Sequence, residues 1–290
     1  MKCCLLLVLK GRKMFKAGYV ALIGKPNAGK SSLLNALIGE KVAIVSSKPQ
    51  TTRDNILGIL TTDDYQIIFV DTPGVHRSKN LLDKSMMKNV RSALAGVDLT
   101  LYLVDGTKDV NQEEQEYINH IEGDKLVVKT KTDLKSRDLD CDISLSSKTG
   151  ENIDCLIEKI LEFLPEYEGP MYIYPPDYYT DKSVKFLVAE EIRESALELL
   201  NQEVPHGIAV EIIRFYEEED IVYIDADIVC EQDRHKGMII GKGGETLKQI
   251  GIKTRKFANE LLGKKVMLKL FVKVEKDWRN KPQKVKNLGY

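Results

Sequence analysis

The sequence predicts an α/β domain with a mostly parallel sheet and helices on both faces, followed by a smaller α+β domain. Three observations support this prediction. Strand-length apolar runs alternate with helix-period segments as far as Leu164, which is typical of a parallel sheet. Residues 166–180 (EYEGPMYIYPPDYYT) are rich in Pro, Gly and Tyr and have no helical period, as expected of a connector between domains. The length of 290 residues also suits about two domains.

The domain bounds follow from this pattern. Residues 1–13 (MKCCLLLVLKGRK) hold a short apolar run with no small-residue cleavage site after it, so we expect an extension upstream of a natural start near Met14. The sequence has no apolar run of the roughly 18 residues that a membrane span needs. Five scattered cysteines fit a reducing cytosol better than a disulfide scaffold. We therefore expect an extension at 1–13, an α/β domain at 14–166, a linker at 167–181, an α+β domain at 182–278 and a basic tail at 279–290.

The charge of the chain is unevenly distributed. The formal net charge is −1, but residues 234–290 contain 16 Lys and Arg against 4 Asp and Glu, which gives +12. The 233 residues before them carry the remaining 27 basic and 40 acidic side chains, which gives −13. This asymmetry predicts that the C-terminal part binds a polyanion, which the net charge alone would hide.

The first strand, expected at Tyr19–Ile23, leads directly into a phosphate-binding pattern. Glycines in such a loop let backbone N–H groups close around a phosphate, and the N-terminus of the following helix adds its positive dipole end. The lysine reaches the β- and γ-phosphates, and the hydroxyl of the last residue ligates Mg²⁺. The complete G-x-x-x-x-G-K-S pattern, in its required strand–loop–helix context, consists of Gly24, Lys25, Pro26, Asn27, Ala28, Gly29, Lys30 and Ser31.

A second buried strand, expected at Ile67–Val70, ends in Asp71, Thr72, Pro73 and Gly74. A carboxylate at the end of a strand is placed to hold the water shell of Mg²⁺. A glycine amide can approach a γ-phosphate closely because glycine has no Cβ. The segment QTTRD, residues 50–54, lies between the two patterns, and a threonine there can complete the metal shell when a triphosphate is bound.

A base-recognition segment follows a later strand. After the expected third strand at Leu99–Val104, a fourth begins at Lys125–Val128 and ends in Thr130, Lys131, Thr132 and Asp133. The Asp133 carboxylate can accept hydrogen bonds from N1–H and the N2 amino group of guanine, a donor pair that adenine does not offer. A further segment (SLSSKTG) lies between a short strand and a helix and contains Ser146, Ser147 and Lys148.

These five segments resemble the G1 to G5 boxes of translation-factor-class GTPases, and the pairing of QTTRD with DTPG resembles the TrmE–Era group in particular. The resemblance implies a P-loop GTPase domain that binds GTP or GDP with Mg²⁺. It implies that residues 24–31 bind phosphate, that Ser31 and Thr52 (rather than Thr51) ligate Mg²⁺, and that Asp71 holds the metal through water. It further implies that Lys30, Thr52 and Gly74 are catalytic, that residues 130–133 hold guanine, and that residues 146–148 support the base.

Two residues depart from the pattern of these GTPases. Thr130 stands where the base-binding box usually starts with Asn, so we expect guanine selectivity to survive through Asp133 with a weaker affinity. Val75 stands where Ras-like enzymes place a glutamine that orients water. In relatives an Asn at the position of Asn27 helps to hold a K⁺ ion, and we hypothesise the same site here. Without such help we expect slow turnover, about 10⁻⁴–10⁻² s⁻¹.

The second domain has a glycine-rich turn of its own. A short apolar helical turn leads into GKGG, and the helix after it has an apolar face with Leu247 and Ile250 and a basic face. The order helix–strand–strand–helix–GxxG–helix–strand resembles an α+β type II KH domain, in which the GxxG loop clamps the backbone of about four unstacked nucleotides. The residues expected to bind RNA are Lys236, Gly241, Lys242, Gly243, Gly244, Lys248, Lys253 and Arg255.

The basic tail admits two interpretations. Residues 278–290 (WRNKPQKVKNLGY) include Arg279, Lys281, Lys284 and Lys286. They form either a solvated, frayed C-terminus or a source of extra phosphate contacts, which would steepen the salt dependence of RNA binding.

A GTPase domain of this kind joined to a type II KH domain resembles the Era family of bacterial GTPases, in stretches such as GKPNAGKSSLLNALIG and KGMIIGKGGETLKQIG. The resemblance implies a monomeric, cytoplasmic GTPase with a slow intrinsic rate that RNA and K⁺ stimulate. It implies binding to the 3′ end of 16S rRNA, action in 16S rRNA processing and 30S subunit biogenesis, and peripheral contact with the inner face of the cell membrane. Two alternatives stay open: an RNA-binding module whose nucleotide domain is a scaffold with negligible turnover, and a P-loop kinase or ATPase.

Overall fold

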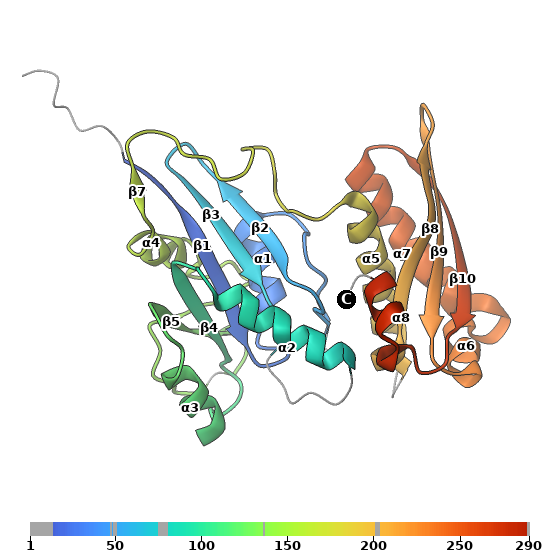
Figure 1. The fold of residues 1–290 in the computed structure, drawn as a ribbon, viewed down its shortest axis with the longest axis horizontal. Coiled ribbons are helices and arrows are strands. Elements are labelled where there is room, and N and C mark those ends of the chain that lie inside the picture. The colour runs from blue at the N-terminus through green and yellow to red at the C-terminus, as the bar shows by residue number, and fades with distance from the viewer. Residues whose placement is uncertain are drawn as a thin grey trace, which may run out of the picture.

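The computed structural model describes residues 14–46, 48, 51–74, 81–135, 137–200 and 204–288, which form two sheets with their helices (Figure 1). The predicted extension at 1–13 and the departure at Val75 lie outside the described residues. None of the described helices is long and apolar enough to cross a membrane.

The first sheet is mixed but mostly parallel, as predicted. Its strand order is β2-β3-β1-β4-β5-β6, with β7 paired to β1. The β1, β3, β4, β5 and β6 neighbours run parallel, whereas β2 pairs antiparallel with β3 and β7 antiparallel with β1. The strands are β1 (Phe15–Gly24), β2 (Ile56–Thr61), β3 (Tyr65–Asp71), β4 (Leu99–Asp105), β5 (Lys125–Thr130), β6 (Ile143–Ser144) and β7 (Glu166–Tyr167).

Helices cover both faces of this sheet. Leu33 of α1 and Ile160 of α4 pack in the core on one face, and Ile118 of α3 packs with Tyr102 on the other. Figure 1 shows α2 and α3 in front of the sheet and α1 behind it. Because the central strands are buried on both sides, they consist of nearly continuous apolar runs. The helices are α1 (Lys30–Ile38), α2 (Leu81–Leu94), α3 (Gln112–Asn119) and α4 (Ile153–Leu161).

The second sheet has three strands in the order β10-β9-β8, with β9 and β10 parallel and β8 and β9 antiparallel. Helices cover one face of this sheet, and the core of the second domain lies between them. Ile192 of α5, Ile239 of α6 and Ile250 of α7 pack there against the strands. The element order is the predicted one, so the α+β prediction is confirmed. The elements are α5 (Val184–Leu199), η1 (Val204–Gly207), β8 (Ala209–Glu217), β9 (Ile221–Cys230), α6 (Asp233–Ile240), η2 (Lys242–Gly244), α7 (Glu245–Leu262), β10 (Lys265–Val274), η3 (Trp278–Asn280) and α8 (Pro282–Asn287).

The connector between the sheets is fastened to the first domain. The Gln66 side chain donates to the carbonyl of Tyr174 at 2.8 Å and accepts from the amides of Ile173 and Tyr174. The Ile59 amide donates to the carbonyl of Tyr179 at 2.9 Å. The Ile59 bond and the bridge between Gly58 and Thr180 cover part of the outer edge of β2, which would otherwise present unpaired backbone groups.

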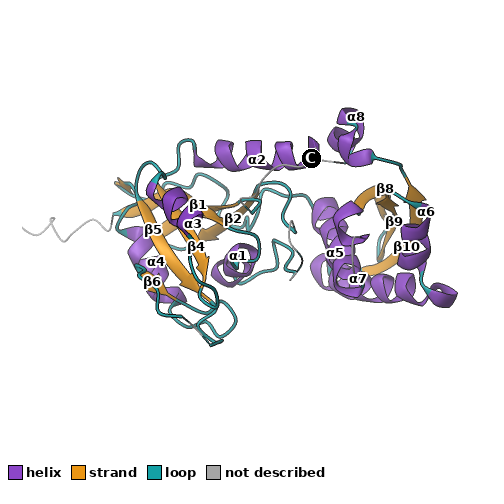
Figure 2. Ribbon diagram, turned by 90° about the horizontal axis from the view of Figure 1, so that it is seen from below, coloured by secondary structure: helices purple, strands orange, loops and turns teal. Residues whose placement is uncertain are grey.

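The C-terminal segment corrects the interpretation of a frayed tail. Trp278 is fully buried and donates its indole N–H to the carbonyl of Gly207 at 3.0 Å. With Val285 it packs against Leu82 and Met86 of α2, and Figures 1 and 2 both show α2 extending toward α8. Trp278, Val285 and Leu288 of this segment therefore take part in the contact between the domains.

Candidate functional site

The phosphate-binding loop is a tight turn between β1 and α1. Gly29 has φ 94° and Asn27 has φ 65°, both in the left-handed region. A Cβ on Gly24 would lie 2.4 Å from the carbonyl oxygen of Leu103, so only glycine fits there. The Lys25 side chain leaves the loop and pairs with Glu114 of α3 at 2.7 Å. Lys25 can therefore serve a phosphate only through its backbone.

Lys30 is buried at the base of this loop. Its Nζ donates to the carbonyls of Gly24 at 3.0 Å and Lys25 at 3.1 Å. Burial lowers the pKa of Lys30 to about 8, and the charge of Asp71 opposes that shift. A buried ammonium held by carbonyls and a more distant carboxylate is suited to a strongly anionic ligand such as a triphosphate.

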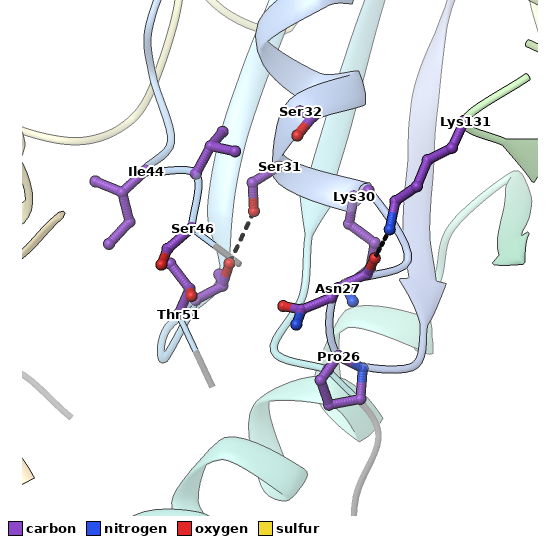
Figure 3. Close-up of a pocket in the computed structure, with 13 residues that line it drawn as sticks. Pro26, Asn27, Lys30, Ser31, Ser32, Ile44, Ser46, Thr51 and Lys131 are labelled. Carbon is purple, nitrogen blue, oxygen red and sulfur yellow. Dashed lines mark hydrogen bonds between the residues drawn. The ribbon is translucent and has the colours of Figure 1, made fainter. Parts of the chain in front are cut away.

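Three oxygen-bearing side chains meet beside Lys30. The Ser31 hydroxyl lies 2.7 Å from Oδ2 of Asp71 and 2.8 Å from Oγ1 of Thr52 (Figure 3 marks the latter bond). Thr51 does not join them, because its hydroxyl donates to the carbonyl of Lys48 at 2.7 Å. Of the two threonines that the sequence offered, the geometry favours Thr52.

The Asp71 carboxylate fits a cation. It is fully buried, its Oδ1 has no hydrogen-bond partner among the described residues, and burial raises its pKa to about 6. A nearby cation favours the ionised carboxylate, and Mg²⁺ prefers oxygen ligands of this kind. The residues present therefore fit a Mg²⁺ ion held by Ser31 and Thr52, with Asp71 behind them.

Gly74 closes the same pocket from the end of β3. A Cβ at Gly74 would come within 2.8–2.9 Å of the Pro26 backbone and ring, so the two loops require glycine here. Thr72 fixes the segment by donating its hydroxyl to the carbonyl of Leu22 at 2.8 Å. Pro73 connects Thr72 to Gly74. The pocket thus joins residues that are far apart in sequence: Pro26, Asn27, Lys30, Ser31, Thr52 and Gly74.

Thr130 braces the base-binding loop against the phosphate loop. It is fully buried, and its Oγ1 lies 2.8 Å from the carbonyl oxygen of Ala28 and 3.0 Å from that of Val104. A hydroxyl satisfies this position without contacting a base. The prediction of a weaker guanine affinity, which rested on Thr130, stays untested.

Lys131 lies across the end of the phosphate loop. Its Nζ donates to the carbonyl of Asn27 and to Oδ2 of Asp105, both at 2.7 Å (the former bond is drawn in Figure 3). Burial opposes ionisation of Asp105, but hydrogen bonds from Lys131 and Thr107 outweigh it and lower the pKa of Asp105 to about 2. Asp105 was missed from sequence, although it ends a buried strand as Asp71 does.

Asp133 is an exposed carboxylate two residues after Lys131, and it is not among the residues that line the phosphate pocket. The buried hydroxyl of Ser146 donates to its Oδ1 at 2.7 Å and so orients it. Thr132 donates to Glu151 at 2.7 Å, which joins the loop to the Ser146–Glu151 bridge. Ser147 and Lys148 follow in the turn after Ser146. The two predicted base-binding segments are therefore neighbours in the structure.

The glycine-rich turn of the second domain needs its glycines. Gly241, Gly243 and Gly244 all have positive φ, at 76°, 61° and 81°. Lys242 between them is exposed, as is Lys236 on α6. An exposed loop of this shape lets a sugar–phosphate chain approach the backbone amides.

A groove runs from this turn between α7 and β10. Gly244, Lys248 and Arg255 line it, whereas the predicted Lys253 ion-pairs with Glu198 of α5. Its apolar lining was missed from sequence: Leu247, Gly251, Ile252, Leu268 and Leu270. A glycine inside a helix was the available signal, because Gly251 leaves room beside Leu270.

The fold and the two sites define a P-loop nucleotide-binding protein joined to a KH domain. The family model described as a 50S ribosome-binding GTPase matches residues 19–131, and a KH domain model matches residues 203–279. The chain is 44% identical to GTPase Era of Clostridium acetobutylicum, over 96% of this chain and 98% of that one. It is 46% identical to GTPase Era of Caldanaerobacter subterraneus, over 95% and 98%. The chain belongs to the Era family of GTPases.

Solved structures agree with this assignment. The structure of Era in complex with MgGDPNP and nucleotides 1506–1542 of 16S ribosomal RNA has a TM-score of 0.90 and 35% identity, covering 95% of this chain and 99% of that one. An Aquifex aeolicus Era variant bound to GDP and AlF₄⁻ has the same TM-score, identity and coverage. Both the nucleotide domain and the KH domain are included in these matches.

Proposed function

We propose that this chain is a ribosome assembly GTPase that binds the 3′ end of 16S rRNA through its KH domain and acts in 16S rRNA processing and 30S subunit biogenesis. One observation carries the proposal. A phosphate and metal pocket and an exposed GxxG groove occur in one chain, in the layout of an Era that binds MgGDPNP and 16S rRNA nucleotides.

The nucleotide-binding residues then have distinct roles. When bound, Mg²⁺ neutralises charge on the β- and γ-phosphate oxygens. Ser31 and Thr52 would hold the ion directly, and Asp71 would hold it through water. Lys30 contacts the β- and γ-phosphates, and the Gly74 amide approaches the γ-phosphate. Asp133 selects guanine because its carboxylate accepts two hydrogen bonds that adenine cannot donate.

The K⁺ hypothesis at Asn27 is part of the proposal. Asn27 lines the pocket with its backbone in a left-handed conformation, and Figure 3 shows its side chain directed into the pocket. Hydrolysis rates in K⁺ and in Na⁺ test it, for the parent and for Asn27→Ala. We expect faster hydrolysis in K⁺ for the parent only. Equal rates of the parent in the two salts would remove the hypothesis.

Single-turnover hydrolysis separates the proposal from its alternatives. GTP and ATP are compared, each with and without an oligonucleotide of the rRNA 3′ end. GTP-specific hydrolysis that the RNA accelerates supports the proposal. Tight RNA binding without hydrolysis would support the scaffold alternative instead. A preference for ATP would support a P-loop kinase or ATPase, against which the exposed Asp133 argues.

The proposal includes a cytoplasmic monomer with peripheral membrane contact, which rests on the family resemblance. The basic surface of residues 234–290 offers charge for anionic lipid headgroups. Co-sedimentation with anionic and with neutral vesicles tests the membrane part. Binding to neither kind of vesicle would remove it and leave the RNA-binding proposal intact.

A further inference from the structure

The second domain contacts both neighbours of Thr52, the backbone of Thr51 and the side chain of Arg53. On one side, Nη2 of Arg193 donates to the carbonyl of Thr51 at 2.5 Å. On the other side, Nη1 of Arg53 donates to the carbonyl of Ile208 at 2.7 Å. Between them, Thr52 turns its hydroxyl toward Ser31. The position of a metal-binding residue of the first domain is thus fixed by contacts with the second.

Arg193 is held rigidly for this contact. It lies on α5 and is 1% exposed. Its Nε donates to Oε1 of Glu190 at 2.8 Å, and its Nη2 donates to Oε2 of the same carboxylate. A buried guanidinium is costly unless it is paired, and a two-pronged pair also fixes its plane. With Glu190 occupying one edge, Nη2 is directed at the carbonyl of Thr51.

Arg53 is held by the C-terminal part of the chain. It is 4% exposed, and its guanidinium lies 5.8 Å from the ring centroid of Trp278. Trp278 in turn donates to the carbonyl of Gly207, next to the Ile208 carbonyl that Arg53 contacts. The same tryptophan therefore connects Arg53, the start of β8 and helix α2.

The segment before Thr51 is held by α5 as well. Lys41 ion-pairs with Glu191 at 2.6 Å and with Glu194 at 2.7 Å. The Val45 amide donates to Glu194 at 3.2 Å, and Nζ of Lys48 donates to the carbonyl of Leu200 at 3.0 Å. In Figure 2, α5 is the second-domain helix that lies toward the loops beside α1. Helix α5 and its C-cap residue Leu200 thus contact Lys41, Val45, Lys48 and Thr51.

We propose that Arg193, fixed by Glu190, is a positioning residue for Thr52 and makes the recognition of a triphosphate depend on where the KH domain sits. The inference rests on the proposed function of the pocket as a Mg²⁺–GTP site. A diphosphate lacks the γ-phosphate beside which Thr52 completes the metal shell, so its binding does not need this contact. By linkage, RNA that shifts the KH domain changes the GTP affinity, and GTP changes the RNA affinity by the same factor.

A double-mutant cycle on the full-length chain tests this inference. The variants are Arg193→Gln, Thr52→Ala and the double substitution, and the readouts are the affinities for a non-hydrolysable GTP analogue and for GDP in Mg²⁺. We expect Arg193→Gln to weaken analogue binding about tenfold and GDP binding less than twofold. We expect it to add nothing once Thr52 is Ala, because contacting residues that act through one another are not additive.

Two further variants serve as controls. Arg214→Gln removes an arginine–aspartate pair at 2.8 Å within the second domain, away from Thr51, and should leave both affinities unchanged. Glu190→Gln keeps one oxygen that can accept a hydrogen bond from the Arg193 guanidinium. It should therefore cause a smaller loss of analogue affinity than Arg193→Gln. It also provides the test if Arg193→Gln does not fold.

Each outcome bears on the inference. An Arg193→Gln loss that is equal for analogue and GDP, or that adds fully to Thr52→Ala, would overturn the positioning role and leave the GTPase proposal standing. A parent that binds the analogue no differently after Thr52→Ala would overturn both. The inference is supported if Arg193→Gln lowers the preference for the analogue over GDP in the parent chain but causes no further loss in the Thr52→Ala background.

Discussion

The nucleotide pocket and the RNA groove hold their charged groups in opposite ways. Lys30 and Asp71 are buried, and their hydrogen-bond partners lie on β1, on α1 and in two loops. Lys248 and Arg255 are exposed on one helix, and Lys248 forms a surface pair with Glu245 at 3.5 Å. The pocket therefore selects its ligand by geometry, whereas the groove attracts phosphates by additive charge. A single substitution in the nucleotide pocket should therefore change the ligand affinity strongly. A single substitution of a basic residue in the RNA groove should change the affinity weakly, and several such changes should add.

The largest effect is expected at the base-reading carboxylate. Asp133→Asn replaces an acceptor of two hydrogen bonds to guanine, each worth about 1.5–3 kcal/mol when charged. GDP affinity, measured by calorimetry, should fall by about 10²–10⁴-fold. Asp138→Asn, a nearby exposed carboxylate, is the control. A loss below tenfold would mean that Asp133 does not read the base.

The next largest effect is expected in the glycine turn. Gly241 is a poor test position, because a Cβ there would lie 2.3 Å from the Thr246 hydroxyl. Gly243→Asp has open space and places a carboxylate against a bound phosphate, which costs about 1–4 kcal/mol. RNA affinity should fall at least fivefold. Gly263→Asp, with φ 62° and equally open space, matches the backbone strain without the RNA contact. Equal losses in the two variants would argue against RNA binding at this turn.

The pair between Asp105 and Lys131 should contribute to stability. The pKa of Asp105 is about 2 in the folded chain, below the ordinary value of 3.8, so its stabilisation is present above pH 3.8 and lost as the pH falls through 2. Asp105→Asn should lower the free energy of unfolding by about 2 kcal/mol at pH 7 and by less at pH 3. Urea denaturation measures both values. Asp109 forms an exposed pair with Arg137, so Asp109→Asn should change the free energy of unfolding little. A loss of stability as large as that of Asp105→Asn would show that the buried pair contributes no more than the exposed one.

The smallest effect concerns which basic residues belong to the groove. Arg255 lines it, and Lys253 instead pairs with Glu198. Arg255→Gln should reduce the slope of RNA affinity against salt by about 0.7 for each phosphate that the side chain no longer neutralises, and Lys253→Gln should leave the slope unchanged. The opposite ranking would restore Lys253 to the RNA-binding residues predicted from sequence.

The predictable part of the molecule is local in sequence. The phosphate loop, the metal carboxylate and the base-binding loop each follow a strand, so each was placed from a few adjacent residues and the rule that parallel strands end at one edge. Even Thr130, which departs from the usual pattern, fits because its hydroxyl bridges two carbonyls.

The unpredicted part depends on contacts that are distant in sequence. Glu190, Glu191, Arg193 and Glu194 resemble a solvated helix face in sequence, yet all four are buried. Their burial depends on Lys41 and the Thr51 carbonyl, roughly 140–150 residues away, which no local periodicity reports. The packing of Trp278 against α2 was missed for the same reason.

The most direct test of the whole account is the affinity of the full-length chain for an oligonucleotide of the 16S rRNA 3′ end, measured once with a GTP analogue and once with GDP in Mg²⁺. If the nucleotide pocket and the KH groove are linked through α5, the two RNA affinities should differ by at least about fivefold. The RNA should change the ratio of the two nucleotide affinities by the same factor. Equal RNA affinities in the two nucleotide states would contradict the linkage and leave two independent binding domains.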